Sequence, residues 1–308
     1  MNIVVAGGGG FIGSHLTESL LSDNHNVIVV DTFCSSQKQN LAAVQESDNL
    51  NIIEQDVIEP VQIDTDVDYV LHFASRASPP DYQDNKIHTM RTNAEGTLNL
   101  LRLAHQHNAS FLFASTSEVY GNPEIHPQVE TYNGNVNTTG PRSCYDEGKR
   151  YGEALITSFA DEYEIDWKII RIFNTYGPRL RKDDGRVISN FIIQALRNEP
   201  ITVYGDGSQT RSFCYVDDLV RGIRAVMKYR GQDVFNLGNP DEYTILELAE
   251  IIQDVVDTKS EIVFKELPKD DPTRRKPDIS KVKKSTDWAP NVSFREGLRK
   301  TVSCFQKD

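Results

Sequence analysis

Tyr145 and Lys149 are the residues whose types and spacing point most directly to chemistry. They stand four positions apart near the start of a stretch, 144–164, that has the spacing of a helix, so their side chains share one face. A free tyrosine is a poor base because its pKa is about 10, but a lysine ammonium one turn away favours the phenolate. The pair is therefore a candidate tyrosine base, although two surface residues would show the same spacing.

A run of hydroxyl side chains strengthens this interpretation. Ser115, Thr116 and Ser117, followed by Glu118, come directly after a strand expected over Phe111–Ala114. Ligands of α/β proteins bind beyond the carboxyl ends of parallel strands, so these side chains would lie beside a bound substrate.

Three glycines, Gly7, Gly10 and Gly13, predict a nucleotide site. They lie directly after an apolar strand, Ile3–Ala6, and open a helix expected over Phe11–Leu21. Glycine lets the backbone approach a diphosphate, and the helix N-terminus supplies unpaired N–H groups and the positive end of the helix dipole. A glycine cluster alone often marks only a turn, so the strand–turn–helix context carries the prediction.

Two acids follow the next expected strands. Asp31 closes the strand Val27–Val30, where a carboxylate accepts the ribose hydroxyls of a dinucleotide and repels a 2′-phosphate. The expected cofactor is therefore NAD rather than NADP. Asp56, with Val57, follows the strand Asn51–Glu54 and could hold the adenine amino group; a turn aspartate is the alternative.

The elements that must position these residues alternate along the first half of the chain. Strands alternating with helices of this length indicate βαβ units, a parallel sheet and right-handed crossovers. We therefore expect an α/β fold with a Rossmann-type, doubly wound parallel sheet. The other strands expected are Tyr69–Phe73 and Lys168–Phe173, and a further helix is expected over 87–107.

The pattern changes after Gly177. The stretch to about 207 is expected to be irregular, while 213–228 and 234–237 have the pattern of a strand, a helix and a strand that return to the sheet. The tail has helix patterns at 245–256 and 294–305 and one strand pattern at 261–264. We expect residues 1–176 and 213–239 to form a dinucleotide-binding domain, and residues 177–212 and 240–308 a smaller, discontinuous substrate domain.

Bulk properties exclude several classes of function. A net charge of −12 over 308 residues argues against a nucleic-acid binder, which would need a basic surface. The four cysteines form no CxxC pair, so neither a disulfide framework nor a metal site is expected. We find no signal peptide and no apolar run of transmembrane length, and we expect a cytoplasmic protein with no membrane partner.

These motifs together resemble the extended short-chain dehydrogenase/reductase family. The resemblance rests on the three glycines, on 115–121 (STSEVYG) and on the pair Tyr145 and Lys149. Longer strings resemble the UDP-glucuronate decarboxylase branch of that family and run almost from end to end. They are 72–82 (HFASRASPPDY), 140–150 (GPRSCYDEGKR), 171–179 (RIFNTYGPR), 184–191 (DGRVISNF), 203–213 (VYGDGSQTRSF), 236–246 (NLGNPDEYTIL) and 270–279 (DDPTRRKPDI).

The resemblance implies an internal redox cycle with NAD as cofactor. Tyr145 would take the proton of the sugar 4-hydroxyl while hydride passes from C4 to NAD. The resulting 4-ketone would let the C5 carboxylate leave as CO₂, and Thr116 and Tyr145 would stabilise the enolate oxygen. Protonation of C5 and return of the hydride would then convert UDP-glucuronate to UDP-xylose.

The resemblance also assigns roles to single residues. Ser117 replaces the aspartate with which similar dTDP-glucose 4,6-dehydratases expel water, and serine is too weak an acid for that step. Glu118 is expected near the reacting carbon, with a loop acid as the alternative. Arg275 is expected at the substrate carboxylate, which a planar guanidinium suits. The further NAD positions implied are Phe11, Ile12, Ala74, Thr92 and Thr175, and the UDP-sugar positions are Asn174, Arg186, Asn190, Tyr204, Gln209 and Arg211.

Two other functions stay open. A UDP-sugar 4-epimerase would use the same Tyr145 and Lys149 but would need no arginine for a carboxylate. A non-catalytic NAD-binding regulatory protein would be expected to have lost Thr116, Tyr145 or Lys149, and all three are present. The resemblance further implies a homodimer formed through helices near 86–107 and 143–164. Arg76 stands where the family more often has another residue, and it adds a donor to a loop near the substrate.

Overall fold

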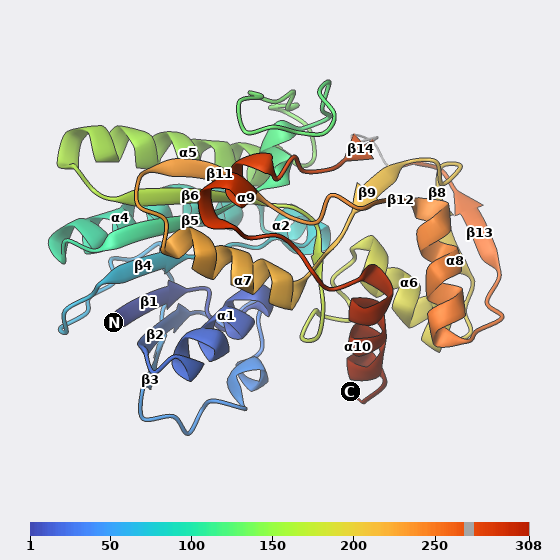
Figure 1. Cartoon of the computed structure of the whole chain (residues 1–308), viewed down its shortest axis with the longest axis horizontal. Coiled ribbons are helices and arrows are strands. Elements are labelled where there is room, and N and C mark those ends of the chain that lie inside the picture. The colour runs from blue at the N-terminus through green and yellow to red at the C-terminus, as the bar shows by residue number, and fades with distance from the viewer. Residues whose placement is uncertain (268–273, 308) are drawn as a thin grey trace.

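The computed structural model describes residues 1–267 and 274–307, and its centre is a sheet of seven parallel strands. Their order across the sheet is β11-β6-β5-β4-β1-β2-β3 (Figure 1). The expected doubly wound parallel sheet is therefore confirmed. The strands are β1 (Asn2–Ala6), β2 (Asn26–Asp31), β3 (Leu50–Glu54), β4 (Tyr69–His72), β5 (Ser110–Thr116), β6 (Trp167–Ile172) and β11 (Asp233–Leu237).

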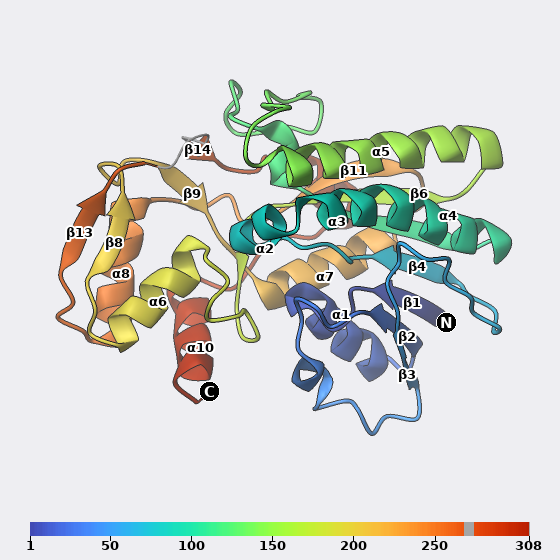
Figure 2. The ribbon, with the colours of Figure 1, turned by 180° about the vertical axis from the view of Figure 1, so that it is seen from behind.

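Helices cover both faces of this sheet, and the side chains on both faces are apolar. Side chains alternate along β1, so Val5 packs with the helices α1 and α7 while Val4 packs with α4 and α5 on the opposite face. Figures 1 and 2 show these two helix layers from opposite sides. The helices are α1 (Phe11–Ser22), α4 (Thr97–Gln106), α5 (Ser143–Tyr163) and α7 (Val216–Met227).

The helical stretch expected over 87–107 is confirmed, but it is not one regular helix. It consists of α3 (Lys86–Arg91), a π-helical turn over Thr92–Gly96 and then α4. A shorter helix, α2 (Pro79–Asp84), comes before it, and a 3₁₀ turn over Ser117–Tyr120 follows β5.

The strand order reverses at β1, which pairs with β2 on one side and with β4 on the other. At such a point the loops beyond the carboxyl ends of the strands leave a crevice in which ligands bind. Gly7 lies there with a φ of +81°, and a Cβ atom on it would lie 2.5 Å from the backbone nitrogen of Ala74. A Cβ atom on Gly13 would overlap the carbonyl oxygen of Gly7, so both positions require glycine.

Two expectations for the second half of the chain are wrong. The stretch expected to be irregular contains the helix α6 (Val187–Leu196) and the strand β8 (Ile201–Tyr204). The strand before α7, β10 (Cys214–Tyr215), pairs with β7 (Thr175–Tyr176), and only β11 returns to the main sheet. β7 and β10 have two residues each, too short for an alternation pattern to reveal.

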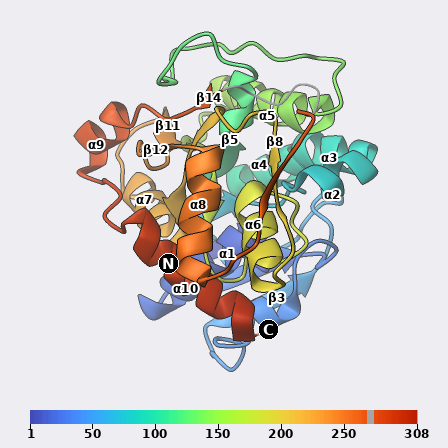
Figure 3. The same ribbon diagram turned by 90° about the vertical axis from the view of Figure 1, so that its right-hand side faces the viewer.

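Most of the remaining elements lie to the right of the main sheet in Figure 1 and face the viewer in Figure 3, while α9 packs beside β11. β13 pairs with β8, while β9 pairs with both β12 and β14. Helices α6, α8 and α10 pack together, and their apolar side chains continue the core of the α1–α7 face. The bounds are β9 (Thr210–Ser212), β12 (Glu242–Thr244), β13 (Ile262–Lys265), β14 (Arg274–Arg275), α8 (Ile245–Val256), α9 (Ser280–Thr286) and α10 (Phe294–Lys307).

Candidate active site

Two adjoining cavities at the carboxyl edge of the sheet contain every site residue expected from the sequence. The larger has a volume of about 790 Å³ and is lined by Gly7, Gly10, Phe11, Ile12, Gly13, Thr116, Glu118, Tyr145, Lys149, Asn174, Thr175, Arg186, Asn190, Tyr204, Gln209, Arg211 and Arg275. The smaller has a volume of about 140 Å³, and its lining includes Gly7, Gly10, Phe11, Asp31, Asp56, Val57, Ala74 and Thr92. Because both cavities include the glycine loop, a ligand that crosses this loop reaches both. Of the string 270–279, residues 270–273 lie outside the described residues.

The N-terminus of α1 opens into both cavities and is free of protein caps. Gly10 is the N-cap residue, it receives no side-chain cap, and the first turn of the helix contains no acid. The backbone N–H groups and the positive end of the helix dipole are therefore available to an anion. This end of α1 fits the diphosphate of NAD.

Asp31 is held in place beside this loop. Its carboxylate accepts hydrogen bonds from the backbone nitrogens of Gly9 (2.9 Å) and Phe33 (2.8 Å) and from the hydroxyl of Ser36 (2.9 Å). The group is half-buried at the carboxyl end of β2, next to the smaller cavity, where it can accept the hydroxyls of a ribose.

Asp56 contacts neighbouring protein groups with both carboxylate oxygens. One carboxylate oxygen accepts from the backbone nitrogen of Ile58 at 3.0 Å, and the other lies 2.8 Å from Nε2 of His88. These are the contacts of a turn aspartate; Asp56 also lines the smaller cavity, and its contact with an adenine stays a prediction. Its neighbour Val57 is buried against Gly96.

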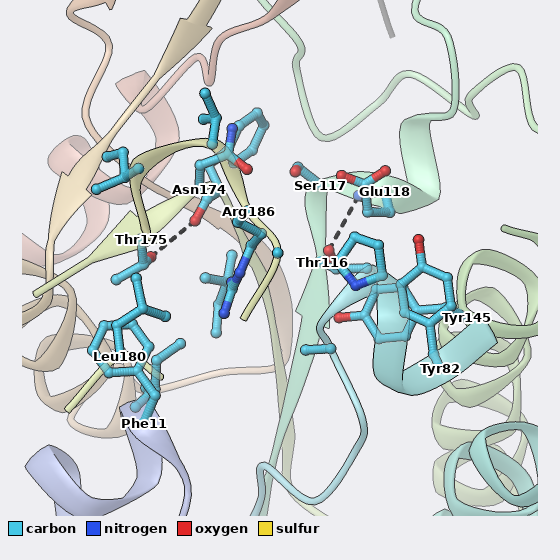
Figure 4. Close-up of a pocket in the computed structure, with 18 of the residues that line it drawn as sticks. Phe11, Tyr82, Thr116, Ser117, Glu118, Tyr145, Asn174, Thr175, Leu180 and Arg186 are labelled. Atoms are coloured by element: carbon cyan, nitrogen blue, oxygen red, sulfur yellow. Dashed lines mark hydrogen bonds between the residues drawn. The ribbon is translucent and has the colours of Figure 1, made fainter. Parts of the chain in front are cut away.

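The candidate base and its partners lie on one wall of the larger cavity (Figure 4). Tyr145 stacks on Tyr82 of α2, with ring centroids 5.2 Å apart and planes 6° from parallel. Lys149 donates from Nζ to the carbonyl of Ala114 at 2.8 Å, and this nitrogen lies 5.9 Å from the centre of the Tyr145 ring. The hydroxyl of Thr116 accepts from the backbone nitrogen of Glu118 at 3.2 Å, which holds it at the end of β5.

Burial dominates the protonation of this pair. It raises the pKa of Tyr145 to about 12, although a hydrogen bond with Thr116 acts in the opposite direction. It lowers the pKa of Lys149 to about 7, because the ammonium is also removed from water. In this structure the tyrosine hydroxyl is therefore protonated at neutral pH, and the lysine alone does not make it a phenolate.

A second group of charges surrounds Glu118. Its carboxylate lies 2.5 Å from Nη2 of Arg142 and 3.2 Å from Nη2 of Arg275, and Arg275 also donates to the backbone carbonyl of Ser117. Burial would raise the pKa of Glu118, but the two arginines outweigh it and hold the pKa well below the usual range. Glu118 is therefore an ionised hydrogen-bond acceptor at neutral pH and cannot serve as an acid.

Sequence reasoning missed two residues of this wall. Arg142 is the nearest partner of Glu118, and Tyr82 supplies the stacking surface for Tyr145. Both lie inside strings that resemble the decarboxylase branch, which was the signal available. Their importance follows from the contact of α2 with α5 and from the position of Arg142 next to the start of α5, which a one-dimensional pattern does not contain.

The opposite side of the larger cavity carries Asn174, Thr175 and Arg186 (Figure 4). Arg186 forms a two-point ion pair with Asp184, in which Nη2 lies 2.8 Å from Oδ2. Thr175 donates to the carbonyl of Phe173 at 2.9 Å. The guanidinium of Arg186 therefore stands at the cavity with its own charge partly compensated.

The second half of the chain supplies the rest of this side. Gln209 donates from Nε2 to the carbonyl of Tyr204 at 2.7 Å, while its Oε1 is buried with no partner among the described residues. Arg211 on β9 and Arg275 on β14 are opposite each other in the parallel strand pair, and both line the cavity. Two arginines from distant segments of the chain therefore lie at the same wall. Asn190 on α6 donates to the carbonyl of Gly185 at 3.0 Å.

We call residues 178–186 the strap. It forms hydrogen bonds to the elements around the smaller cavity, and five of its residues line that cavity: Arg179, Leu180, Arg181, Asp184 and Arg186. Arg181 donates from Nη1 to Asp81 of α2 at 2.8 Å and to the carbonyl of Ser35, after β2, at 3.2 Å. The carbonyl oxygen of the first residue of the strap lies 2.9 Å from Nε2 of His15 on α1. The strap thus connects α1, α2 and the loop after β2, which surround the smaller cavity.

Residues 1–267 and 274–307 contain no group of three His, Cys, Asp or Glu side chains that could hold a metal ion. Within the same residues no helix is long and apolar enough to cross a membrane.

A parallel sheet with an uncapped glycine loop at its switch point, beside a buried tyrosine–lysine pair, defines a dinucleotide-dependent enzyme of the Rossmann type. The chain belongs to the NAD dependent epimerase/dehydratase family, whose model matches residues 3–238. Its cofactor is NAD.

Comparison with known proteins gives two kinds of relatives. The chain is 51% identical over 306 residues to UDP-glucuronic acid decarboxylase 1 of Arabidopsis thaliana, covering 99% of this chain and 70% of that protein. It is 49% identical over 306 residues to UDP-glucuronic acid decarboxylase 1 of Danio rerio, covering 99% and 73%. Among solved structures, a UDP-glucose 4-epimerase from Thermotoga maritima with UDP-glucose is 31% identical, with a TM-score of 0.90 and coverage of 100% and 99%. A UDP-glucuronic acid 4-epimerase from Bacillus cereus with UDP-glucuronic acid and NAD is 27% identical, with a TM-score of 0.89 and the same coverage.

Proposed function

We propose that this protein converts UDP-glucuronate to UDP-xylose and CO₂ and regenerates its bound NAD in each turnover. The observation that carries this proposal is 49–51% identity along nearly the whole chain to proteins named UDP-glucuronic acid decarboxylase. The site supports it, because Arg142 and Arg275 place positive charge beside Tyr145 and Thr116, where an anionic sugar would lie.

Tyr145 is protonated in the structure without ligands, and the positive charge of a bound oxidised nicotinamide ring would favour its phenolate. The phenolate would then take the proton of the sugar 4-hydroxyl and later return it to the same oxygen. NAD, when bound, supplies the two-electron acceptor for oxidation at C4. The hydroxyls of Thr116 and Tyr145 then lie together at the end of β5 and can donate to the oxygen on which negative charge develops as CO₂ leaves. Lys149, held by the carbonyl of Ala114, would position the cofactor ribose rather than move a proton.

Glu118 and Arg275 would have separate roles in the protonation of C5 and in binding the carboxylate. Because Glu118 stays ionised, it can accept hydrogen bonds from a water or a sugar hydroxyl. A water held there would give a proton to C5, and the hydroxide left behind would combine with the released CO₂ as bicarbonate or take a proton from solvent. Arg275 is fully buried and keeps Glu118 and the backbone of Ser117 in place, and its charge favours a carboxylate nearby. Arg142, more exposed than Arg275, is the guanidinium better placed for direct contact with the glucuronate.

The two parts of the chain would divide the ligands between them. We propose that residues 1–176 and 213–239 hold NAD and that residues 177–212 and 240–308 hold the UDP-sugar. The polar residues proposed for UDP all line the larger cavity; Asn174 comes from the end of the first part, and the others from the second are Arg186, Asn190, Tyr204, Gln209 and Arg211.

A UDP-sugar 4-epimerase is the second candidate, favoured by the similarity to solved epimerase structures at 27–31% identity. Incubation of the purified protein with NAD and either UDP-glucuronate or UDP-glucose separates the two. A decarboxylase releases CO₂ and a UDP-pentose from UDP-glucuronate and leaves UDP-glucose unchanged. Conversion of either substrate to an isomer of unchanged mass, with no CO₂, would establish the epimerase instead.

We also propose a homodimer and a cytoplasmic location. The dimer is supported by α3 and α5, which pack side by side and carry exposed apolar side chains: Ile87, Met90, Tyr151 and Tyr163. The location would be tested by fractionation of cells that produce the protein.

A further inference from the structure

Arg76 is a cation at the cofactor cavity that the proposed function has not used. It lies in the loop after β4 and lines the smaller cavity together with Gly7, Gly10 and Phe11. Its Nε is buried and has no hydrogen-bond partner, and within residues 1–267 and 274–307 its guanidinium forms no ion pair. A buried donor of a charged group left without a partner is costly, so a group of this kind is suited to a ligand.

The surroundings of Arg76 show why this donor stands apart. The other arginines that line the same cavity each have a carboxylate partner: Arg179 with Glu18, Arg181 with Asp81 and Arg186 with Asp184. The nearby acids are engaged as well, since Asp31 accepts three hydrogen bonds and Asp56 pairs with His88. Arg76 is thus the cavity arginine whose charge no acid in the described residues compensates.

The location of Arg76 indicates which ligand it would bind. β1 and β4 are neighbours in the sheet, so the loops that follow them meet, and Gly7 lies against Ala74. The uncapped N-terminus of α1 opens at the same place. Arg76 does not line the larger cavity with Tyr145, whereas its neighbours Ser75 and Ala77 line both.

We propose that the guanidinium of Arg76 binds the diphosphate of the dinucleotide, as a second anion-binding group beside the N-terminus of α1. The helix end supplies neutral N–H donors, and Arg76 adds a full charge with two-point geometry. This chain is acidic overall, with a net charge of −12, so a local cation compensates the unfavourable field that a dinucleotide would otherwise meet.

The test measures binding to the purified full chain by calorimetry, with NAD and with UDP as separate probes. Arg76→Gln should weaken NAD binding about tenfold, and Arg76→Lys should give an intermediate Kd, because it keeps the charge and loses the fork. UDP, whose diphosphate would lie in the larger cavity, should bind both variants as it binds the original protein. Arg102→Gln, an exposed arginine on α4, is the charge-matched control and should change neither Kd.

Three outcomes would overturn the assignment. NAD could bind Arg76→Gln with unchanged affinity, UDP could lose affinity in place of NAD, or both probes could weaken together. The inference rests on the NAD cofactor of the proposed function but not on its chemistry. The two claims can fail separately. If the original protein releases no CO₂ but Arg76→Gln still binds NAD tenfold more weakly, the proposed reaction is wrong and the role of Arg76 stands.

Discussion

Three charged side chains at the larger cavity depend on one another, because Glu118 pairs with both Arg142 and Arg275. Leaving one of two buried, paired charges without its partner costs several kcal/mol, about 3–5 kcal/mol in measured cases. Arg275 is 1% exposed and contacts both Glu118 and the backbone of Ser117, so it depends on its partners most strongly. The three side chains should therefore act as one unit in catalysis.

A double-mutant cycle tests this interdependence. Arg142→Gln removes the 2.5 Å contact with Glu118 and should lower kcat about 100-fold, since the carboxylate loses its nearest fixed partner. Glu118→Gln should cause a loss of similar size, and the double variant should lose little more than either single one. Steady-state CO₂ release measures all four proteins. Losses that multiply in the double variant would show that the two residues act independently.

The protonation of Tyr145 gives a pH prediction. Burial penalises the charged phenolate, so the protonated form is favoured and the pKa moves upward, to about 12. The purified protein without added nucleotide should then show no phenolate absorbance from this residue between about pH 7 and about pH 10. The difference in ultraviolet titration between the original protein and Tyr145→Phe isolates the residue. A titration step of one tyrosine near neutral pH in that difference would contradict the prediction.

At the scale of elements, the strap joins the loop after β2 to α2 through Arg181. A hydrogen bond to a charged group contributes about 1.5–3 kcal/mol, so the loss of this contact should let the strap open more often. Arg181→Gln should therefore release NADH roughly tenfold faster in a stopped-flow displacement experiment. Lys182→Gln changes the charge of the neighbouring residue and is the control. An unchanged release rate in Arg181→Gln would show that the strap does not retain the dinucleotide.

Elements with a repeated local pattern could be predicted from the sequence, and those defined by partners could not. The glycine loop after β1, the acid that ends β2 and the helix α8 follow from spacing alone, because each is specified by residues close in the chain. The helix α6 was missed although Ile188, Phe191 and Ile192 have helical spacing, since the loops beside it dominate the local composition. The two-residue strands β7 and β10 have no pattern of their own and exist because they pair.

The candidate site shows the same division. Tyr145 and Lys149 were found from their spacing, and Arg275 only from a resemblance to a family. The contact between Arg275 and Glu118 joins residues 157 positions apart and depends on the pairing of β14 with β9. No local pattern encodes a contact of that kind, and the same is true of Tyr82 against Tyr145.

For the whole molecule, the apolar core of the α1–α7 face continues into α6, α8 and α10. This continuity fixes the walls of the larger cavity relative to each other, because packed cores deform little. Residues as distant in sequence as Gly7, Tyr145 and Arg275 are thereby held around one space.

The proposed dimer makes a prediction at this scale. Ile87 is 71% exposed on α3, and Tyr151 is 52% exposed on the adjoining α5, so burying both against a second copy is favourable. Sedimentation should give the mass of two chains, and the double variant Ile87→Glu with Tyr151→Glu should sediment as one. Exposed Ile125, which lies on neither helix, is the matched control when changed to Glu. A monomer from the original chain, or an unchanged dimer in the double variant, would contradict the proposed interface.

The most direct test of decarboxylation through a C4 ketone is proton NMR of the product formed from UDP-glucuronate and NAD in deuterated water. Loss of CO₂ leaves a carbanion equivalent at C5 that must be quenched by a proton derived from solvent. The product should therefore be UDP-xylose with one deuterium at C5, and Tyr145→Phe should form none of it. Formation of the 4-epimer of UDP-glucuronate, with the carboxylate retained, would contradict the proposed reaction.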